Sequence, residues 1–215
     1  DMITPKSLTV VSINHFDAMP IKDIALEMAQ MPHHSIECVN WPAVSDYRPE
    51  ANFAIAHSEK YIYVHFNVNG EDLRAVNTAN LSPVADDSCV EFFLQVPGSP
   101  EYWNFEFNCI GAVNASHREH RPDAVRLNDE QIALIKRYAS CGNEAFEEIS
   151  GQHEWSLTIA IPFSLISDCK PDYIMGNFYK CAGKTSHPHY LSWSRIDTEK
   201  PNFHVPQYFG KLILL

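Results

Sequence analysis

The chain has 215 residues and a formal net charge of -11, with 45% hydrophobic and 20% charged residues. This composition allows one sizeable buried core, and a single all-β domain of this length is common. The acidic balance excludes a general nucleic-acid binder, because contacts with phosphates require clustered lysine and arginine. No run approaches 18 consecutive apolar residues, so we expect no membrane span.

The N-terminal region contains the first predicted helix. Apolar residues recur at helical spacing between Ile21 and Met28. The sequence shows no linker and no internal repeat. We therefore predict one domain over residues 1–215, with residues 1–39 forming an N-terminal extension packed on it.

Alternation of apolar and polar residues is the dominant pattern after residue 50, and it predicts β-strands that bury one face. Strong alternation covers residues 61–69, 88–96, 102–111 and 154–162, and weaker strands are expected at 52–57, 175–182, 190–196 and 208–215. The residues assigned to the core are Ile62, Val64, Phe66, Val68, Val90, Phe92, Leu94, Trp103, Phe105, Phe107, Trp155, Leu157, Ile159 and Ile161.

A second short helix is predicted after Asn128, which can cap the N-terminus together with Gln131, while Gly142 can end the helix. Strands that bury one face and are separated by turn residues favour antiparallel sheets packed face to face. We therefore predict an all-β fold, an antiparallel β-sandwich of the immunoglobulin-like or jelly-roll type, with one or two short peripheral helices.

Glu91 and Glu106 interrupt two successive strand patterns on the face opposite the core. If these strands pair, three interpretations stay open: solvated outer positions, hydrogen-bonding groups for a ligand, or a glycosidase pair, which needs two carboxyls about 5–10 Å apart. No GxSxG, P-loop or HExxH motif is present, and His187 and His189 lack a third partner at metal-ligand spacing. We therefore assign no catalytic residue and no metal ligand.

The six cysteines lack the close pairs typical of zinc ribbons. Cys89, Cys109 and Cys181 lie in strand-like runs, where a thiol usually behaves as a small core residue. Free thiols are favoured over a disulfide, and the cysteines leave the redox compartment open.

Three motifs occur in order along the chain: DDSCVEFF at 86–93, NFEFN at 104–108, and LSWSRI followed by PNFHVPQYFG. Over residues 40–215 this order resembles the family 9 carbohydrate-binding modules, and most closely their stand-alone relatives. The resemblance implies a sandwich domain that binds oligo- or polysaccharide without cleaving it and serves the degradation of polysaccharides such as xylan. It also favours an extracytoplasmic location, while the unpaired cysteines leave cytoplasmic residence open.

In the family, a sugar lies between two tryptophans and contacts polar strand residues. The resemblance places the strand glutamate at Glu91 and the tryptophan of the closing loop at Phe203. The second tryptophan falls on Ala85, which removes one aromatic wall, and a strand arginine falls on Glu106, which reverses the charge at a sugar contact. Some members hold structural calcium, but no calcium-binding loop is recognisable here, and we predict no required cofactor.

A pyranose has apolar C–H faces and a belt of hydroxyl groups, which suit an aromatic ring flanked by carboxylates and amides. Phe203 is the predicted stacking ring, although it could instead plug the core beneath the last strand. A single ring implies weak binding, with a dissociation constant on the order of 10 μM to 1 mM. The predicted polar contacts are Asn202, His204, Glu91 and Glu106, with Tyr102 and Asn104 as further candidates.

Two other functions stay open. Related sandwich folds carry haem b between a methionine and a histidine. The chain has 5 Met and 11 His, but four of the methionines lie within residues 2–31 and only Met175 lies near a predicted core strand. A glycoside-processing enzyme would use Glu91 and Glu106 as its pair.

Overall fold

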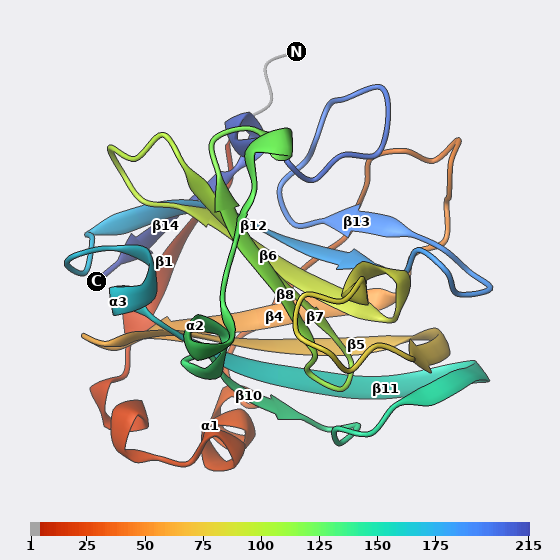
Figure 1. Ribbon diagram of the computed structural model, residues 1–215, viewed down its shortest axis with the longest axis horizontal. Helices are drawn as coiled ribbons and strands as arrows, with labels where there is room; N and C mark the ends of the chain where they lie inside the picture. The colour runs from red at the N-terminus through yellow and green to blue at the C-terminus, as the bar shows by residue number, and fades with distance from the viewer. Residues whose placement is uncertain (1–4) are drawn as a thin grey trace.

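Two β-sheets packed face to face form the body of the protein, and the computed structural model describes residues 5–215 (Figure 1). We call the two layers sheet A and sheet B. Sheet A contains, in spatial order, β14 (Gly210–Leu214), β12 (Tyr173–Cys181), β6 (Cys89–Gln95), β7 (Tyr102–Asn108), β8 (Val113–Arg118) and β9 (Val125–Arg126), with β13 (Tyr190–Ser192) pairing with β12 and β3 (Cys38–Val39) with β13. Sheet B contains β4 (Glu50–His57), β5 (Tyr61–Ala75), β11 (Phe146–Pro162) and β10 (Lys136–Ala139), with β2 (His34–Ser35) pairing with β4.

The strand β1 (Ser7–Ser12) joins the two sheets. Residues 7–10 pair in parallel with β14, and residues 11–12 pair in parallel with β4. Every other strand pair in residues 5–215 is antiparallel. The mostly β sandwich is confirmed, but the prediction of purely antiparallel sheets is wrong at β1. Alternation indicates which face a side chain takes and does not indicate the direction of the neighbouring strand.

The main core fills the space between the sheets. Its centre is Phe178 of β12, whose ring stacks on Phe53 of β4 at 3.6 Å and on Phe92 of β6 at 4.7 Å. All residues assigned to the core from the alternation are buried there, except Trp103, which is partly buried and packs against its margin. Burial of each such aromatic or aliphatic side chain contributes about 1.5–3 kcal/mol.

The helix α1 (Ile21–Met28) is confirmed and covers the side of sheet B that faces away from sheet A (Figure 1). Its buried residues Ile24 and Met28 pack with Phe16 of the preceding 3-10 turn and with Tyr63 of β5. The predicted extension is therefore tied to the sandwich by β1, α1, β2 and β3, and its residues 1–4 lie outside the described part of the chain.

The helix α2 (Asp129–Ala133) begins with the predicted capping box, because the Asn128 side chain accepts a hydrogen bond from the Gln131 backbone and the Gln131 side chain accepts one from the Asn128 backbone. Its predicted end at Gly142 is wrong. Residues 136–139 form β10 instead, because pairing with β11 satisfies their backbone groups. A third short helix, α3 (Phe163–Ile166), follows β11 and was not predicted.

The other short helical segments are 3-10 turns at Asn14–Ala18 (η1), Val84–Asp86 (η2), Arg121–Asp123 (η3) and Pro206–Tyr208 (η4). None of the helices in residues 5–215 is long and apolar enough to span a membrane. All six cysteines are free thiols.

Candidate functional site

The outer face of sheet A, opposite the core, carries polar and aromatic side chains in place of an apolar layer. Because side chains alternate along a strand, residues 89, 91 and 93 of β6 share this face. Glu91 lies directly opposite Glu106 of β7 on one side and opposite Tyr179 of β12 on the other. The two carboxyls and the tyrosine are therefore neighbours on one surface.

Residues 196–209, which we call the closing loop, lie over this surface. Ile196, Val205 and Phe209 are buried against an aromatic cluster that includes Trp41 and Phe93. The loop is also held by hydrogen bonds, because the Trp41 indole donates to the Thr198 carbonyl at 2.9 Å and the Ser194 hydroxyl donates to the Tyr208 carbonyl at 2.7 Å. The loop therefore shields part of an outer face that would otherwise be solvated.

Phe203 is the ring by which the closing loop meets the strands. It stacks on Tyr179 with ring centres 4.1 Å apart and an interplanar angle of 13°. The Tyr179 hydroxyl donates to the Phe203 carbonyl at 3.1 Å. One face of the Phe203 ring is therefore taken by Tyr179, and only its other face and its edge can meet a ligand.

A pocket of about 230 Å³ opens between the closing loop and the strands. Five of the residues predicted as contacts line it, although they come from three separate parts of the chain. The lining residues are Ala85, Glu91, Glu106, Arg121, Cys181, Tyr190, Pro201, Asn202, Phe203 and His204.

The two carboxyls of the pocket are buried, with Glu91 3% and Glu106 8% exposed. The Asn104 amide donates to Glu106 Oε2 at 2.9 Å, whereas Glu91 Oε2 has no hydrogen-bond partner in the described part of the chain. Burial raises the pKa of both groups, and the neighbouring charge of Glu106 raises that of Glu91 further. The pair therefore retains a proton at pH values where an exposed glutamate would be ionised.

His204 is held in a neutral form at the side of the pocket. Burial, followed by the charges of Arg118 and Arg121, lowers its pKa to about 3. Its Nδ1 atom lies 3.0 Å from the Tyr102 hydroxyl, and its backbone N–H donates to the Asn202 side chain at 2.9 Å. A neutral imidazole offers one donor and one acceptor, as sugar hydroxyls require.

Tyr102 and Asn104 lie beneath the site and do not line the pocket. Tyr102 is 1% exposed and contacts His204 as described, while Asn104 is fully buried. The Asn104 carbonyl oxygen accepts from the Ser116 hydroxyl at 2.7 Å and from Arg118 Nε at 3.1 Å. The structure therefore places both residues where they orient His204 and Glu106.

Comparison with known families gives a match between residues 20–214 and the model of carbohydrate-binding family 9. The chain belongs to carbohydrate-binding family 9. A comparison with curated proteins found no match.

Solved structures agree with this family 9 assignment. A Bacteroides uniformis protein proposed to bind carbohydrate is 33% identical, with a TM-score of 0.93 over 99% of this chain and 100% of its own. A family 9 module from Caldicellulosiruptor kristjanssonii, solved with glucose, is 14% identical with a TM-score of 0.57 over 98% of this chain and 96% of its own. The same organism's module with cellotriose is 13% identical with a TM-score of 0.55 over 97% and 93%. At these lower identities the Caldicellulosiruptor modules support the shared fold alone.

Five pocket residues of this family 9 chain were not predicted as contacts: Ala85, Arg121, Cys181, Tyr190 and Pro201. Arg121 begins η3 and Tyr190 begins β13, and their positions at the pocket depend on tertiary packing, while Cys181 was assigned only as a buried strand thiol. The Tyr190 ring lies 6.5 Å from that of Phe203 at an angle of 65°. It therefore does not form a second wall parallel to Phe203, and the position of Ala85 stays without a ring.

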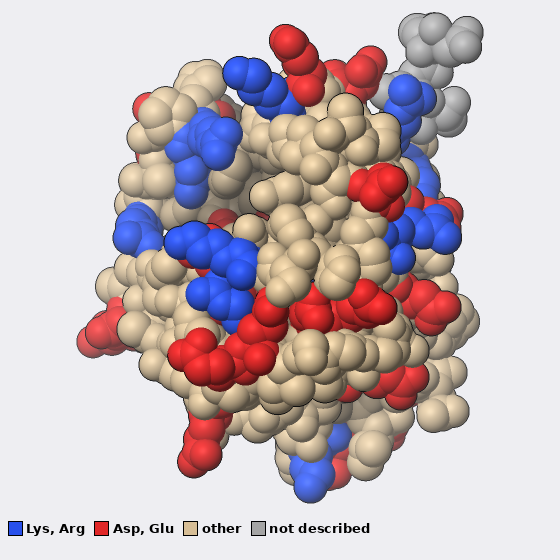
Figure 2. Space-filling model, turned by 90° about the vertical axis from the view of Figure 1, so that its right-hand side faces the viewer, with Lys and Arg blue, Asp and Glu red and all other residues tan. Residues whose placement is uncertain are grey.

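Figure 2 shows the side of this family 9 chain that lies on the right of Figure 1. This side is hollowed, acidic atoms are visible within the hollow, and basic side chains stand beside it. A belt of acidic side chains crosses the surface below. The mixed charge around the hollow does not select strongly for an ion of either sign.

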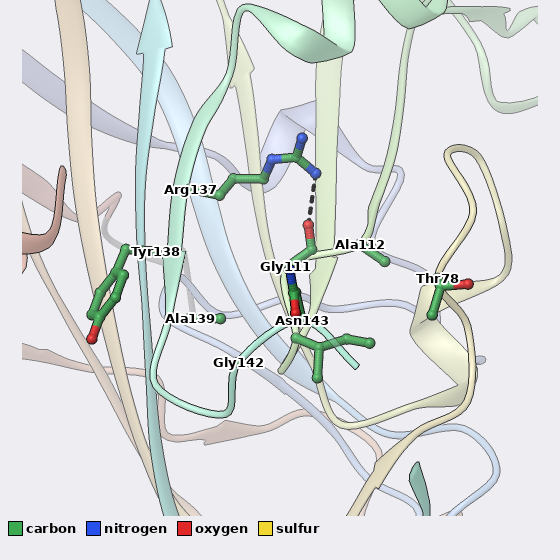
Figure 3. A pocket seen from close by; sticks show the side chains of 9 residues that line it. Thr78, Gly111, Ala112, Arg137, Tyr138, Ala139, Gly142 and Asn143 are labelled. Atoms are coloured by element: carbon green, nitrogen blue, oxygen red, sulfur yellow. Dashed lines mark hydrogen bonds between the residues drawn. The ribbon is translucent and has the colours of Figure 1, made fainter. Parts of the chain in front are cut away.

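A second hollow, of about 580 Å³, lies between β10 and the turn that joins β7 to β8 (Figure 3). None of the predicted contacts lines it. Its one charged lining residue, Arg137, donates to the Gly111 carbonyl at 2.7 Å. The Tyr138 side chain points away from the other labelled residues. This hollow is larger, but it lacks a ring with converging acceptors, so we do not treat it as the primary site of the family 9 chain.

Proposed function

We propose that this family 9 chain binds a neutral sugar in the pocket between the closing loop and the outer face of sheet A. The observation that carries the proposal is the convergence of Phe203, Asn202 and His204 with Glu91 and Glu106 around one pocket. Glu91 Oε2 is buried without a partner in residues 5–215, and such an atom costs about 1–3 kcal/mol until it is satisfied. A sugar hydroxyl would supply the missing hydrogen bond.

The chemistry of the pocket suits a sugar better than an ion. The exposed part of the Phe203 ring can meet the C–H face of a pyranose, while the amide, imidazole and carboxyl groups can exchange hydrogen bonds with its hydroxyls. At about 230 Å³ the pocket is smaller than the roughly 300–1,000 Å³ of typical small-molecule sites. We therefore expect it to hold one sugar unit, such as the end of a chain, with the rest of an oligosaccharide outside.

We infer that the carboxyl pair binds and does not cleave. A glycosidase places its two carboxyls on opposite sides of the scissile bond. Glu91 and Glu106 instead stand side by side on one sheet surface, so both reach a ligand from the same direction. Glucose and cellotriose, which the Caldicellulosiruptor modules hold, are reasonable first ligands.

Isothermal titration calorimetry with glucose, cello-oligosaccharides and xylo-oligosaccharides tests the proposal. We expect at least one ligand to bind with a dissociation constant on the order of 10 μM to 1 mM. Failure of the whole panel, in a protein whose thermal unfolding is cooperative, would remove this proposal. Measurement of reducing ends released from the same sugars checks the absence of cleavage.

A further inference from the structure

Two thiols and a carboxyl meet at the floor of the pocket. Cys89 of β6 and Cys181 of β12 are directly opposite each other, and Glu91 follows Cys89 on the same face of its strand. Glu91 Oε1 lies 3.9 Å from the Cys89 sulfur and 3.8 Å from the Cys181 sulfur. One ligand atom from each of the three residues lies within 4.8 Å of the other two.

These distances are close to those of a tetrahedral metal site. With Zn–S bonds of about 2.3 Å and Zn–O bonds of about 2.0–2.2 Å, the edges of a tetrahedron are about 3.8 Å between two sulfurs and about 3.5 Å between sulfur and oxygen. The observed sulfur–oxygen distances exceed this edge by only a few tenths of an ångström. Small side-chain adjustments would therefore bring the three atoms onto one ion.

A second observation points to a cation at the same place. Glu91 is almost fully buried, and its Oε2 atom has no partner among residues 5–215. The nearest carboxyl across the sheet, that of Glu106, increases the negative charge around it. A buried carboxyl with soft thiol neighbours and no salt bridge within residues 5–215 suits a thiophilic divalent ion.

We propose that Cys89, Cys181 and Glu91 form a binding site for a thiophilic divalent cation such as Zn²⁺. The cation would bind whether or not a sugar is present. The three residues supply three ligands. Because Cys181 and Glu91 also line the pocket, the fourth position is open to a water molecule from it. Three protein ligands with one open position is an established arrangement for zinc.

Binding at this site must displace protons. A metal ion binds cysteine as the thiolate and glutamate as the carboxylate, so any proton that these groups carry passes to the solvent, and affinity increases with pH.

Titration of the reduced full chain with Co²⁺ tests the site. We expect one tightly bound Co²⁺ per chain, with the ligand-to-metal absorption of cobalt thiolates and the strong visible bands of tetrahedral cobalt. Zn²⁺ should displace the cobalt and remove both signals. A reduced protein that gives no thiolate-to-cobalt absorption would overturn the proposal, whether or not Cys89 and Cys181 form a disulfide on oxidation.

Variants then assign the ligands. Cys181→Ser and Cys89→Ser should each lose the tetrahedral cobalt spectrum, whereas Cys169→Ser, which alters an exposed thiol, should retain it. If Cys181→Ser or Cys89→Ser does not fold, Glu91→Gln tests the site instead. It keeps both thiols and the side-chain volume, and it should weaken cobalt binding. Unchanged cobalt affinity in all folded variants of the three ligands would show that the ion binds elsewhere.

The metal site and the sugar site can fail separately. Phe203→Ala leaves all three proposed metal ligands in place, so it should abolish sugar binding and retain the cobalt spectrum. Cys89→Ser should lose the metal while the protein still binds sugar in the presence of a chelator, because Cys89 does not line the pocket. Loss of sugar binding alone leaves the metal proposal intact, and loss of the cobalt spectrum alone leaves the proposed function intact.

Discussion

The outer faces of the two sheets are both covered, but by different means. On sheet B, α1 and the turn before it place Phe16, Ile24 and Met28 on small residues of β4 and on Tyr63. On sheet A, the closing loop covers buried carboxyls and leaves a pocket beside them. The first cover is an apolar contact that stabilises the fold, whereas the second encloses polar groups at a cost in stability.

This difference indicates where function resides in the sandwich. A cover that only protects a sheet can be largely apolar, with its polar groups paired internally, as the Tyr63 hydroxyl on sheet B donates to Asp17 at 2.5 Å. A surface that binds a ligand instead holds polar groups without an internal partner, as Glu91 Oε2 is on sheet A. The four predictions below test this contrast, from the largest expected effect to the smallest.

Phe16→Ala should destabilise the fold most. Phe16 is 1% exposed and packs edge to face on Tyr63 at 5.3 Å, so its removal leaves a cavity under the helical cover. We expect a loss of about 3 kcal/mol in the free energy of unfolding, measured by urea denaturation. Sugar affinity of the folded protein should be unchanged, and a loss below about 1 kcal/mol would mean that this cover is not a packed core.

Phe203→Ala should reduce sugar affinity more than it reduces stability, in contrast to Phe16→Ala. Loss of the ring should weaken sugar binding at least about tenfold, or about 1.4 kcal/mol, in calorimetric titrations. Stability should fall by only about 1 kcal/mol, the contribution of a stacked pair such as that with Tyr179. A large drop in unfolding temperature with sugar affinity retained would show that Phe203 is a core plug.

Glu91→Gln should weaken sugar binding by about tenfold, because an amide cannot reproduce both acceptor oxygens of the carboxyl. It should also change the dependence of stability on pH. The raised pKa values mean that the folded protein keeps protons which the unfolded chain releases above its ordinary glutamate pKa. Stability conferred by the pair is therefore present below that pKa and is lost as the pH rises toward the raised values.

The pH effect is measured by urea denaturation of the parent protein and the variant from pH 4 upward. We expect the free energy of unfolding of the parent protein to decline more steeply with rising pH than that of Glu91→Gln. Parallel curves would show that the carboxyl pair does not retain a proton in the folded state.

Tyr138→Ala should have the smallest effect. This residue lies on β10 and borders the larger hollow, which no residue of the closing loop lines (Figure 3). We expect sugar affinity within about 0.3 kcal/mol of the parent value, since the hollow takes no part in binding, as for a distant site. A marked loss of sugar affinity would move the binding site from the outer face of sheet A to this hollow.

The sequence predicted the parts of the fold that depend on local periodicity. The core faces of β5, β6 and β11 follow from alternation, and the start of α2 follows from the Asn128–Gln131 capping box. The end of α2 could not be predicted. By their sequence, residues 136–139 could continue the helix, and they form a strand because they pair with β11. Alternation could not show the parallel pairing of β1 either.

The site was also predictable only where local sequence patterns identify its residues. Glu91, Glu106 and Phe203 could be identified from strand faces and from motifs resembling the family, and the structure brings them to one pocket. Arg121 and Tyr190 could not, because no local pattern in η3 or at the start of β13 relates them to β6. Nor could the burial of Glu91, since an outward-facing strand residue is solvated unless a distant segment covers it.

The hydrogen bonds of β1 have a consequence for how the protein is made. This strand comes from one end of the described chain, and residues 7–10 pair with β14 at the other end. Such pairing closes a very long loop, which slows folding. During synthesis, β1 can complete its pairing only after β14 has been made, and the aromatic segment before β14 must be made before that pairing forms.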